Sequence, residues 1–332
     1  MKTHSHLFTL AALAVAASSA FGQTATTPPV GYRTETIKGN AFNLVSADLD
    51  NPVAVAGIID AVAGTTLTDN DVDFTNPALG TGLILQITEG ANQGFTAFVT
   101  GVTQHTVTTA QDISALITAG TTKYEIRKAL TIADLFGATN SAGLQSGNQT
   151  TADKLWILDE SGLFQQYYYA DAAPPFITVG WRKVAGGNTD RAAVPVYFTD
   201  GIFIQRVAAT DKDIVFTGHV RKIKSKVGIE TGFNYLSRVL PVPMTLAQSG
   251  LETELQAGNQ TTADKVWIPD GAGGYSQYYF ATAQPPFITA GWRKVAGGNT
   301  DQSGVSITSA FIIERVGAAT NATLAIPAGL DI

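Results

Sequence analysis

Short runs of alternating apolar and polar residues fill most of the chain and predict β-strands. The stretch Asp153–Ala170 places an apolar run, a Ser-Gly turn and an aromatic run in succession, which predicts a β-hairpin. The stretch Asp264–Ala281 repeats this order, with Pro269 expected at a strand end because proline cannot donate a ladder hydrogen bond. Helical periodicity is weak, and only Leu130–Ala138 is expected to form a short helix. The pattern predicts an all-β protein.

A long internal repeat organises these strands. Residues 144–190 and 255–301 are identical at 35 of 47 positions, at a constant offset of 111 residues. Both copies contain GNQTTADK, a Trp-Ile pair, QYY, PPFIT and the undecapeptide GWRKVAGGNTD. A Phe-Asn-x-x-Ser core also occurs twice upstream, at Phe42, Asn43 and Ser46 and at Phe233, Asn234 and Ser237. We interpret the repeat as two homologous β-modules of sandwich or barrel type.

The first module is expected to be interrupted. Short runs rich in Val, Ile, Thr and Phe, separated by Gly at hairpin spacing, fill residues 53–127 and predict a small antiparallel β-barrel domain. An insertion of this kind is tolerated at an exposed loop. The predicted divisions are residues 35–52 plus 128–220 for the first module, 53–127 for the inserted domain and 221–332 for the second module.

The N-terminus predicts export. Lys2 precedes an apolar stretch, and small residues at Ala20 and Gly22 predict cleavage of a signal peptide at residues 1–22. We therefore expect a periplasmic, cell-surface or extracellular protein. No later stretch approaches the roughly 18 apolar residues of a membrane span, so no transmembrane segment is expected.

Residues 23–34 are expected to form an extended N-terminal arm. One hypothesis is that the stretch Gln23–Lys38 adds a strand to a neighbouring molecule; the alternative is an ordinary disordered terminus.

The amino-acid composition excludes several kinds of partner and of catalytic or metal site. Charged residues make up 14% of the chain and the net charge is −6, which argues against nucleic acid as a partner. The absence of cysteine excludes thiol nucleophiles and thiolate metal sites. Beyond the signal peptide only His105 and His219 remain, both outside the repeat, which excludes a duplicated histidine-based site. We expect a non-enzymatic protein. The recurring carboxylate pairs, Asp153 with Asp159 and Asp264 with Asp270, leave a glycan-active enzyme as the less favoured alternative.

Aromatic and cationic side chains of the repeat are the candidate contacts to a partner or glycan. A tryptophan offers a flat apolar face, and a neighbouring cation stacks on it or binds a carboxylate. The candidate residues are Tyr168, Trp181 and Arg182 in the first copy and Tyr279, Trp292 and Arg293 in the second. The alternative is that each tryptophan packs in a core while the cations face solvent. The Gly-Gly-Asn that follows predicts a turn.

Two polar segments remain. Asp69, Asp71 and Asp73 resemble the start of a calcium loop, but the turn glycine and closing glutamate are missing, so a polar hairpin tip is favoured. We expect no cofactor, with calcium as the alternative. His219–Val227 alternates apolar and basic residues, which predicts a lysine-guarded edge strand or a cationic contact surface.

The order of these motifs resembles a family of exported bacterial proteins that are functionally uncharacterised and often present as paralogues. The motifs are a start of the Gly-x-x-Asn-Leu type, a short helical segment, the Trp, QYY and GWR elements, and a closing Phe-Ile-x-Arg strand. The resemblance covers nearly the whole mature chain. It implies export and a β-rich modular build, and it implies no activity.

We therefore expect an exported structural protein of a surface layer, filament or matrix, in contact with its own copies, other surface proteins or polysaccharide. The alternative is a bivalent carbohydrate-binding protein. Exposed tryptophans would favour the second class, and buried tryptophans the first.

Overall fold

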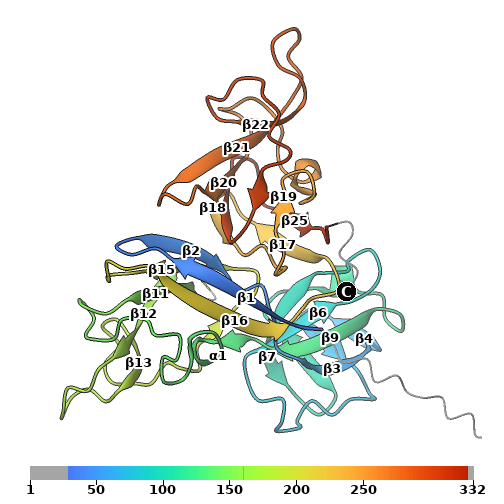
Figure 1. The fold of residues 1–332 in the computed structure, drawn as a ribbon. Coiled ribbons are helices and arrows are strands. Elements are labelled where there is room, and N and C mark those ends of the chain that lie inside the picture. Colours follow the sequence, from blue (N-terminus) through green and yellow to red (C-terminus); the bar gives the residue numbers. More distant parts are fainter. Residues whose placement is uncertain (1–28, 160, 328–332) are drawn as a thin grey trace, which may run out of the picture.

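The chain forms several antiparallel β-sheets with very little helix, which confirms the all-β prediction (Figure 1). The computed structural model describes residues 29–159 and 161–327. Two of the sheets have five strands, one has seven, and four are two-stranded ribbons within these residues.

The first five-stranded sheet joins segments from both sides of the seven-stranded one in sequence. Strand β2, which precedes residues 53–128, pairs with β15, which follows them, in register from Ser46 opposite Gly201 to Phe42 opposite Gln205. In spatial order the strands are β2 (Phe42–Ser46), β15 (Gly201–Gln205), β11 (Lys154–Leu158), β12 (Phe164–Ala170) and β13 (Gly180–Lys183).

The second five-stranded sheet has the corresponding order. Its strands are β18 (Gly232–Leu236), β24 (Phe311–Arg315), β20 (Lys265–Pro269), β21 (Tyr275–Ala281) and β22 (Gly291–Lys294). The predicted hairpins are β11–β12 and β20–β21, and Pro269 is the last residue of its strand.

Residues 53–128 form the seven-stranded sheet, which has its own core around residues such as Leu85, Tyr124 and Ile126. In spatial order its strands are β3 (Val53–Ile58), β9 (Lys123–Lys128), β6 (Leu83–Ile87), β7 (Thr96–Val102), β8 (Thr106–Thr109), β5 (Thr66–Thr68) and β4 (Ala61–Ala63). A 3₁₀ turn, η1 (Ser114–Leu116), precedes β9.

The ribbon of β1 (Val30–Ile37) and β16 (Lys212–His219) corrects the prediction of a free arm. All eight residues of β1 pair with β16 of the same chain, and Ile37 is fully buried. The alternating pattern did make a strand, but its partner lies within the molecule and not on a neighbour. Of the arm predicted at 23–34, residues 23–28 lie outside the described residues.

The remaining ribbons pair short strands around the two five-stranded sheets. They are β10 (Leu130–Thr131) with β14 (Pro195–Val196), β17 (Ser225–Ile229) with β25 (Thr320–Leu324), and β19 (Met244–Thr245) with β23 (Ser306–Ile307). The prediction of one alternating strand over His219–Val227 was wrong: the segment leaves β16, crosses as coil and enters β17, and Arg221 in its middle is buried.

The expected short helix is α1 (Ile132–Phe136). Thr131 begins it with a reciprocal capping box, because its hydroxyl accepts from the Asp134 N–H and its own N–H donates to the Asp134 carboxylate. Gly137 ends it at a positive φ of 85°. Helix α1 packs its apolar side into the hydrophobic core that contains Trp181. A 3₁₀ turn, η2 (Leu251–Thr253), places the buried Leu251 in the core that contains Trp292.

Candidate functional site

The six predicted contact residues are buried. Their exposed fractions are 0% for Trp181, 2% for Arg182, Trp292 and Arg293, and 7% for Tyr168 and Tyr279. The expectation that they present a surface to a partner or glycan is therefore wrong for this structure. The alternative, tryptophans in the core, describes their placement, but it is also incomplete because the arginines do not face solvent.

The loop between β12 and β13 explains the burial. Ile177 of this loop and Val184, which follows β13, pack on the cluster of Tyr168 and cover the outer face of β12. On the inner face, the Trp181 ring meets Tyr169 edge to face at 5.3 Å between centroids, and its indole N–H donates to the Gly137 carbonyl at 2.8 Å. The sheet is thus packed on both sides.

Arg182 holds this loop together from inside. Its Nε donates to Asn188 Oδ1 at 3.0 Å, and its Nη1 donates to the Trp181 carbonyl at 2.7 Å. Its Nη2 donates to both the carbonyl and the hydroxyl of Thr178, at 2.8 and 2.6 Å. Asp190 adds an ion pair at 3.3 Å from the exposed side. One planar guanidinium therefore joins the loop before β13, at Thr178, to the loop after β13, at Asn188 and Asp190, which a point-charge ammonium has too few fixed donors to do.

The second copy has the same clamp. Arg293 donates from Nε to Asn299 at 3.0 Å, from Nη1 to the Trp292 carbonyl at 2.7 Å and from Nη2 to the Thr289 carbonyl at 2.9 Å. Asp301 lies 3.3 Å from Nη1. The duplicated undecapeptide is therefore a duplicated loop clamp, whose arginine, asparagine and aspartate all have a hydrogen-bonding role.

The predicted Gly-Gly-Asn turn is confirmed in both copies. Gly187 and Gly298 have φ of 70°, a left-handed conformation that glycine adopts without strain. The asparagine after each glycine then accepts from its arginine and from the N–H of Thr178 or Thr289. The turn places this acceptor inside the loop.

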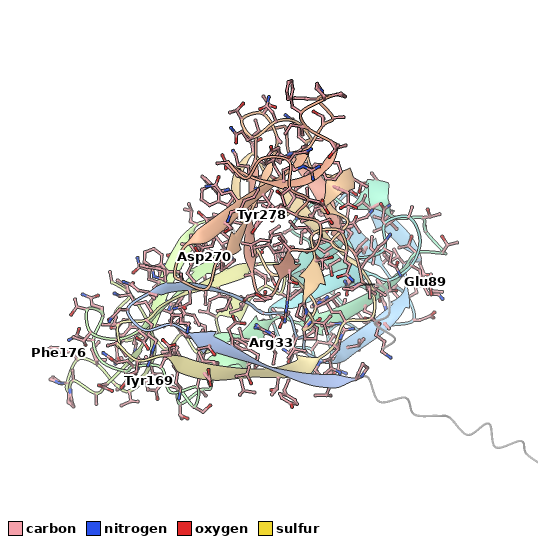
Figure 2. The ribbon with its side chains drawn as sticks, turned by 45° about the horizontal axis from the view of Figure 1, so that its top comes forward. Arg33, Glu89, Tyr169, Phe176, Asp270 and Tyr278 are labelled. Atoms are coloured by element: carbon pink, nitrogen blue, oxygen red, sulfur yellow. The ribbon has the colours of Figure 1, made fainter. Side chains whose placement is uncertain are left out.

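Each clamped loop carries one exposed phenylalanine. Phe176 is 78% exposed and Phe287 is 79% exposed, at equivalent positions in PPFIT. Each ends a tight turn: the Phe176 N–H donates to the Ala173 carbonyl, and the Phe287 N–H to the Gln284 carbonyl, both at 3.0 Å. Figure 2 shows Phe176 at the outer end of its loop. A large apolar side chain at the same solvent-facing point of two ordered loops is the candidate functional site.

Sequence reasoning missed these two residues. PPFIT was visible as a shared element, but its aromatic residue had no predicted role. An available signal was the pair of prolines before the phenylalanine, since prolines at this spacing favour a turn and a turn at a loop tip faces solvent.

The recurring carboxylates have structural roles. Asp153 is buried and accepts from Arg206 Nη1 at 2.6 Å and from the Val207 N–H at 2.7 Å; Asp264 has the same contacts with Arg315 and Val316. The hairpin carboxylates accept backbone N–H groups: Asp159 from Ser161 and Leu163, and Asp270 from Ala272 and Gly274. Both carboxylates of each pair thus accept hydrogen bonds from residues in or beside the hairpin.

The acidic tip of the inserted segment turns partly inward. Asp69 is buried and accepts from the Tyr124 hydroxyl at 2.7 Å, while Asp73 accepts from the Thr75 N–H and hydroxyl. Burial, helped by the bond to Asp69, raises the pKa of Tyr124 well above its usual value. Among the described residues, no group of three or more His, Cys, Asp or Glu side chains is arranged to hold a metal ion.

A cavity of about 380 Å³ lies between β7, the segment before β15 and the start of the second five-stranded sheet. Phe98 of β7, Asp200 before β15, Glu230 before β18 and Leu236 of β18 all border it. Burial raises the pKa of Asp200 to about 6, against the opposing effect of a hydrogen bond from the Thr199 hydroxyl at 3.0 Å. The Asp200 carboxyl therefore titrates near pH 6 in the folded protein.

Comparison with known proteins gives no further assignment: no family model, no curated protein and no solved structure matches the chain. Within the part of the chain that the structure describes, none of the helices is both long and apolar enough to cross a membrane.

Proposed function

We propose that this chain is an exported, non-enzymatic structural protein that assembles at the cell surface or in the extracellular matrix through the tips of its two clamped loops. The observation that carries the proposal is the matched exposure of Phe176 and Phe287 on loops whose arginine clamps are the same. The resemblance to exported β-rich bacterial proteins supports the exported location only.

An exposed phenylalanine side chain leaves apolar surface in water, and a partner that covers it gains free energy. Burying one such side chain at a partner contributes about 1.5–3 kcal/mol. The clamp fixes the loop before binding, so little additional entropy is lost on association. Two equivalent contacts on one molecule then act together, because the second is effectively intramolecular once the first has formed.

The placement of the loops favours bridging. In Figure 1 the loop beyond β12 and β13 lies at the lower left, and the loops beyond β21 and β22 lie at the top. Contacts at two ends of a molecule connect different neighbours, which is what a filament, layer or matrix subunit requires. The partner that we propose is a second copy of the chain.

Carbohydrate binding remains the second candidate, on different residues from those first expected. Phe42 with Trp156 and Phe233 with Trp267 form matched edge-to-face pairs, each at 5.7 Å between centroids. The two phenylalanines are 50% and 54% exposed. These pairs are the half-open aromatic surface that a sugar ring would contact in both copies.

The test compares two double variants of the mature chain, residues 23–332, by light-scattering mass and electron microscopy. We expect the wild type to form ordered assemblies, Phe176→Ala with Phe287→Ala to abolish them, and Phe42→Ala with Phe233→Ala to retain them. A wild type that stays monomeric at all concentrations overturns self-assembly. Glycan binding that only the Phe42 and Phe233 variant loses would establish the second candidate instead.

A further inference from the structure

A second cavity, of about 190 Å³, lies between the seven-stranded sheet and the coil that connects β16 to β17. The sheet contributes Gln86 of β6 and Glu125 and Arg127 of β9 to its wall, and the connection contributes His219, Arg221 and Lys222. These polar residues come from parts of the chain more than 90 positions apart, so the cavity exists only in the folded protein.

Four nitrogen atoms around this cavity are buried and have no hydrogen-bond partner among the described residues. They are Gln86 Nε2, Arg127 Nε, His219 Nδ1 and Arg221 Nε. Gln86 and Arg221 are each only 3% exposed. A buried donor without an acceptor costs about 1–3 kcal/mol, and such groups are rare in native proteins. A concentration of them on one cavity points to a ligand that supplies acceptors.

The protein's own acceptors at this place are already engaged. Asp50 forms a short ion pair with Arg221 Nη2 and lies 3.5 Å from Arg127 Nε, and Glu125 accepts from Arg127 Nη2 at 2.6 Å. Gln86 Oε1 accepts from Arg221 Nη1 at 3.2 Å. The guanidinium of Arg221 is also held over the ring of Phe198. The side chains that carry the free donors are therefore fixed in place, and they cannot turn toward another acceptor of the protein.

Charge decides which kind of acceptor fits. The two arginines balance the two carboxylates, and Lys222 is exposed at the wall, which leaves an excess of one positive charge. Burial lowers the pKa of Arg221 to about 10, with Asp50 opposing the change, so Arg221 stays charged at neutral pH. An anion is favoured over a neutral acceptor, and the nearby carboxylates limit its affinity.

We propose that this cavity binds a small oxyanion, whose oxygens accept hydrogen bonds from Gln86, Arg127 and Arg221 while Lys222 faces it from the rim. The volume is enough for one such group with water, since a water molecule takes about 30 Å³ of liquid. The oxyanion is either a free ion or the acidic group of a saccharide. Bound there, it joins the inserted segment to the first module and stabilises their contact.

The experiment is calorimetry and thermal unfolding of the mature chain with sodium sulfate, sodium phosphate and sodium glucuronate, against sodium chloride at equal ionic strength. We expect saturable binding with a dissociation constant of about 1 mM. Binding of sulfate or phosphate alone identifies a free ion, and binding of glucuronate identifies an acidic saccharide.

Two variants separate a site from general salt effects. Lys222→Glu reverses the rim charge, and Gln86→Glu keeps the acceptor to Arg221 but removes the free donor; each is expected to weaken binding at least tenfold. Lys294→Glu, the same charge change on an exposed residue of the second module, is the control and should bind as wild type. Sulfate also stabilises proteins by exclusion from their surface. Equal stabilisation in all four proteins, or no saturable binding to the wild type, overturns the proposal.

Discussion

At the residue scale, this protein uses buried arginines as connectors. Arg182 and Arg293 each satisfy backbone and side-chain acceptors in the two loops that flank one strand, whereas Arg206 and Arg315 each pair with a buried aspartate. Removing one partner of such a buried group leaves the other uncompensated, which costs more than the contact itself contributes. The arginines and their acceptors, which are identical in the two copies of the repeat, therefore have the same hydrogen-bonding role in both.

The clamp predicts that Arg182→Lys and Arg293→Lys each destabilise the protein by about 2 kcal/mol or more, because a lysine ammonium cannot reach all the acceptors of the fork. Urea unfolding measures the change. The neighbouring substitutions Lys183→Ala and Lys294→Ala serve as controls and should change the free energy of unfolding by less than about 0.5 kcal/mol. A lysine variant as stable as its alanine control would contradict the role assigned to the guanidinium.

Asp200 predicts a pH dependence. Its pKa is about 6 in the folded state against an ordinary value of 3.8, so the folded protein holds a proton that the unfolded chain releases between these values. Its contribution therefore makes stability fall as pH rises from about 4 to 6. Asp200→Asn should be about 1 kcal/mol more stable than wild type at pH 7.5 and no more stable at pH 3.5. Urea unfolding at both pH values checks this, and an equal gain at both would refute it.

At the element scale, ribbon β1–β16 shows how far local pattern reaches. Alternation in Val30–Ile37 is strand-like, but the partner lies about 180 residues further on, and nothing in the local sequence identifies it. In the structure Ile37 of β1 lies in one core with Ile214 and Phe216 of β16, which are 1% and 2% exposed, and the Arg33 guanidinium lies over the Phe216 ring at 5.2 Å. The strand is thus part of that core.

A truncation tests this. A chain beginning at Lys38 lacks β1 and should be less stable than a chain beginning at Pro29 by several kcal/mol, because two buried apolar side chains of β16 become exposed at about 1.5–3 kcal/mol each. Denaturant midpoints of the two truncated proteins give the difference. Equal midpoints would mean that β1 is dispensable.

Hairpins, the short helix and the turn could be predicted because their signals are local: alternation around a Ser-Gly or Gly-rich turn, the Thr131 to Asp134 capping box, and Gly-Gly-Asn. The candidate site could not. The burial of Arg182 depends on the segments before and after β13, which fold over the outer face of β12, and the sequence alternative placed Arg182 in solvent. The exposure of Phe176 follows from the same fold-back, which no single-strand pattern contains.

At the scale of the whole molecule, Asp48 joins the two five-stranded sheets. It is fully buried between Arg33 of β1 and Arg238 after β18, with Nε to carboxylate distances of 3.0 and 2.9 Å. Arg238 also donates from Nη1 to the Thr308 carbonyl at 2.6 Å. Figure 2 places Arg33 near the middle of the molecule. An apolar cluster around Leu44 and Ile312 adjoins this ion network, so charge and packing act at one junction.

This junction predicts that Asp48→Asn destabilises the protein by about 3–5 kcal/mol, because it leaves the buried Arg238 without its counter-charge and Arg33 with Glu35 alone. Since Arg33 lies on β1 and Arg238 follows β18 of the second five-stranded sheet, the loss should also uncouple these two parts, and unfolding followed by calorimetry should change from one transition to two. Asp211→Asn makes the same chemical change in an exposed ion pair with Lys38, where the cost is expected to stay below about 1 kcal/mol. A single transition with a midpoint like that of the Asp211 variant would show that the modules are held together by the apolar cluster alone. Two transitions, with the midpoint of the lower one shifted by the substitution, would show that the Asp48 carboxylate supplies the free energy that couples the unfolding of the two repeats.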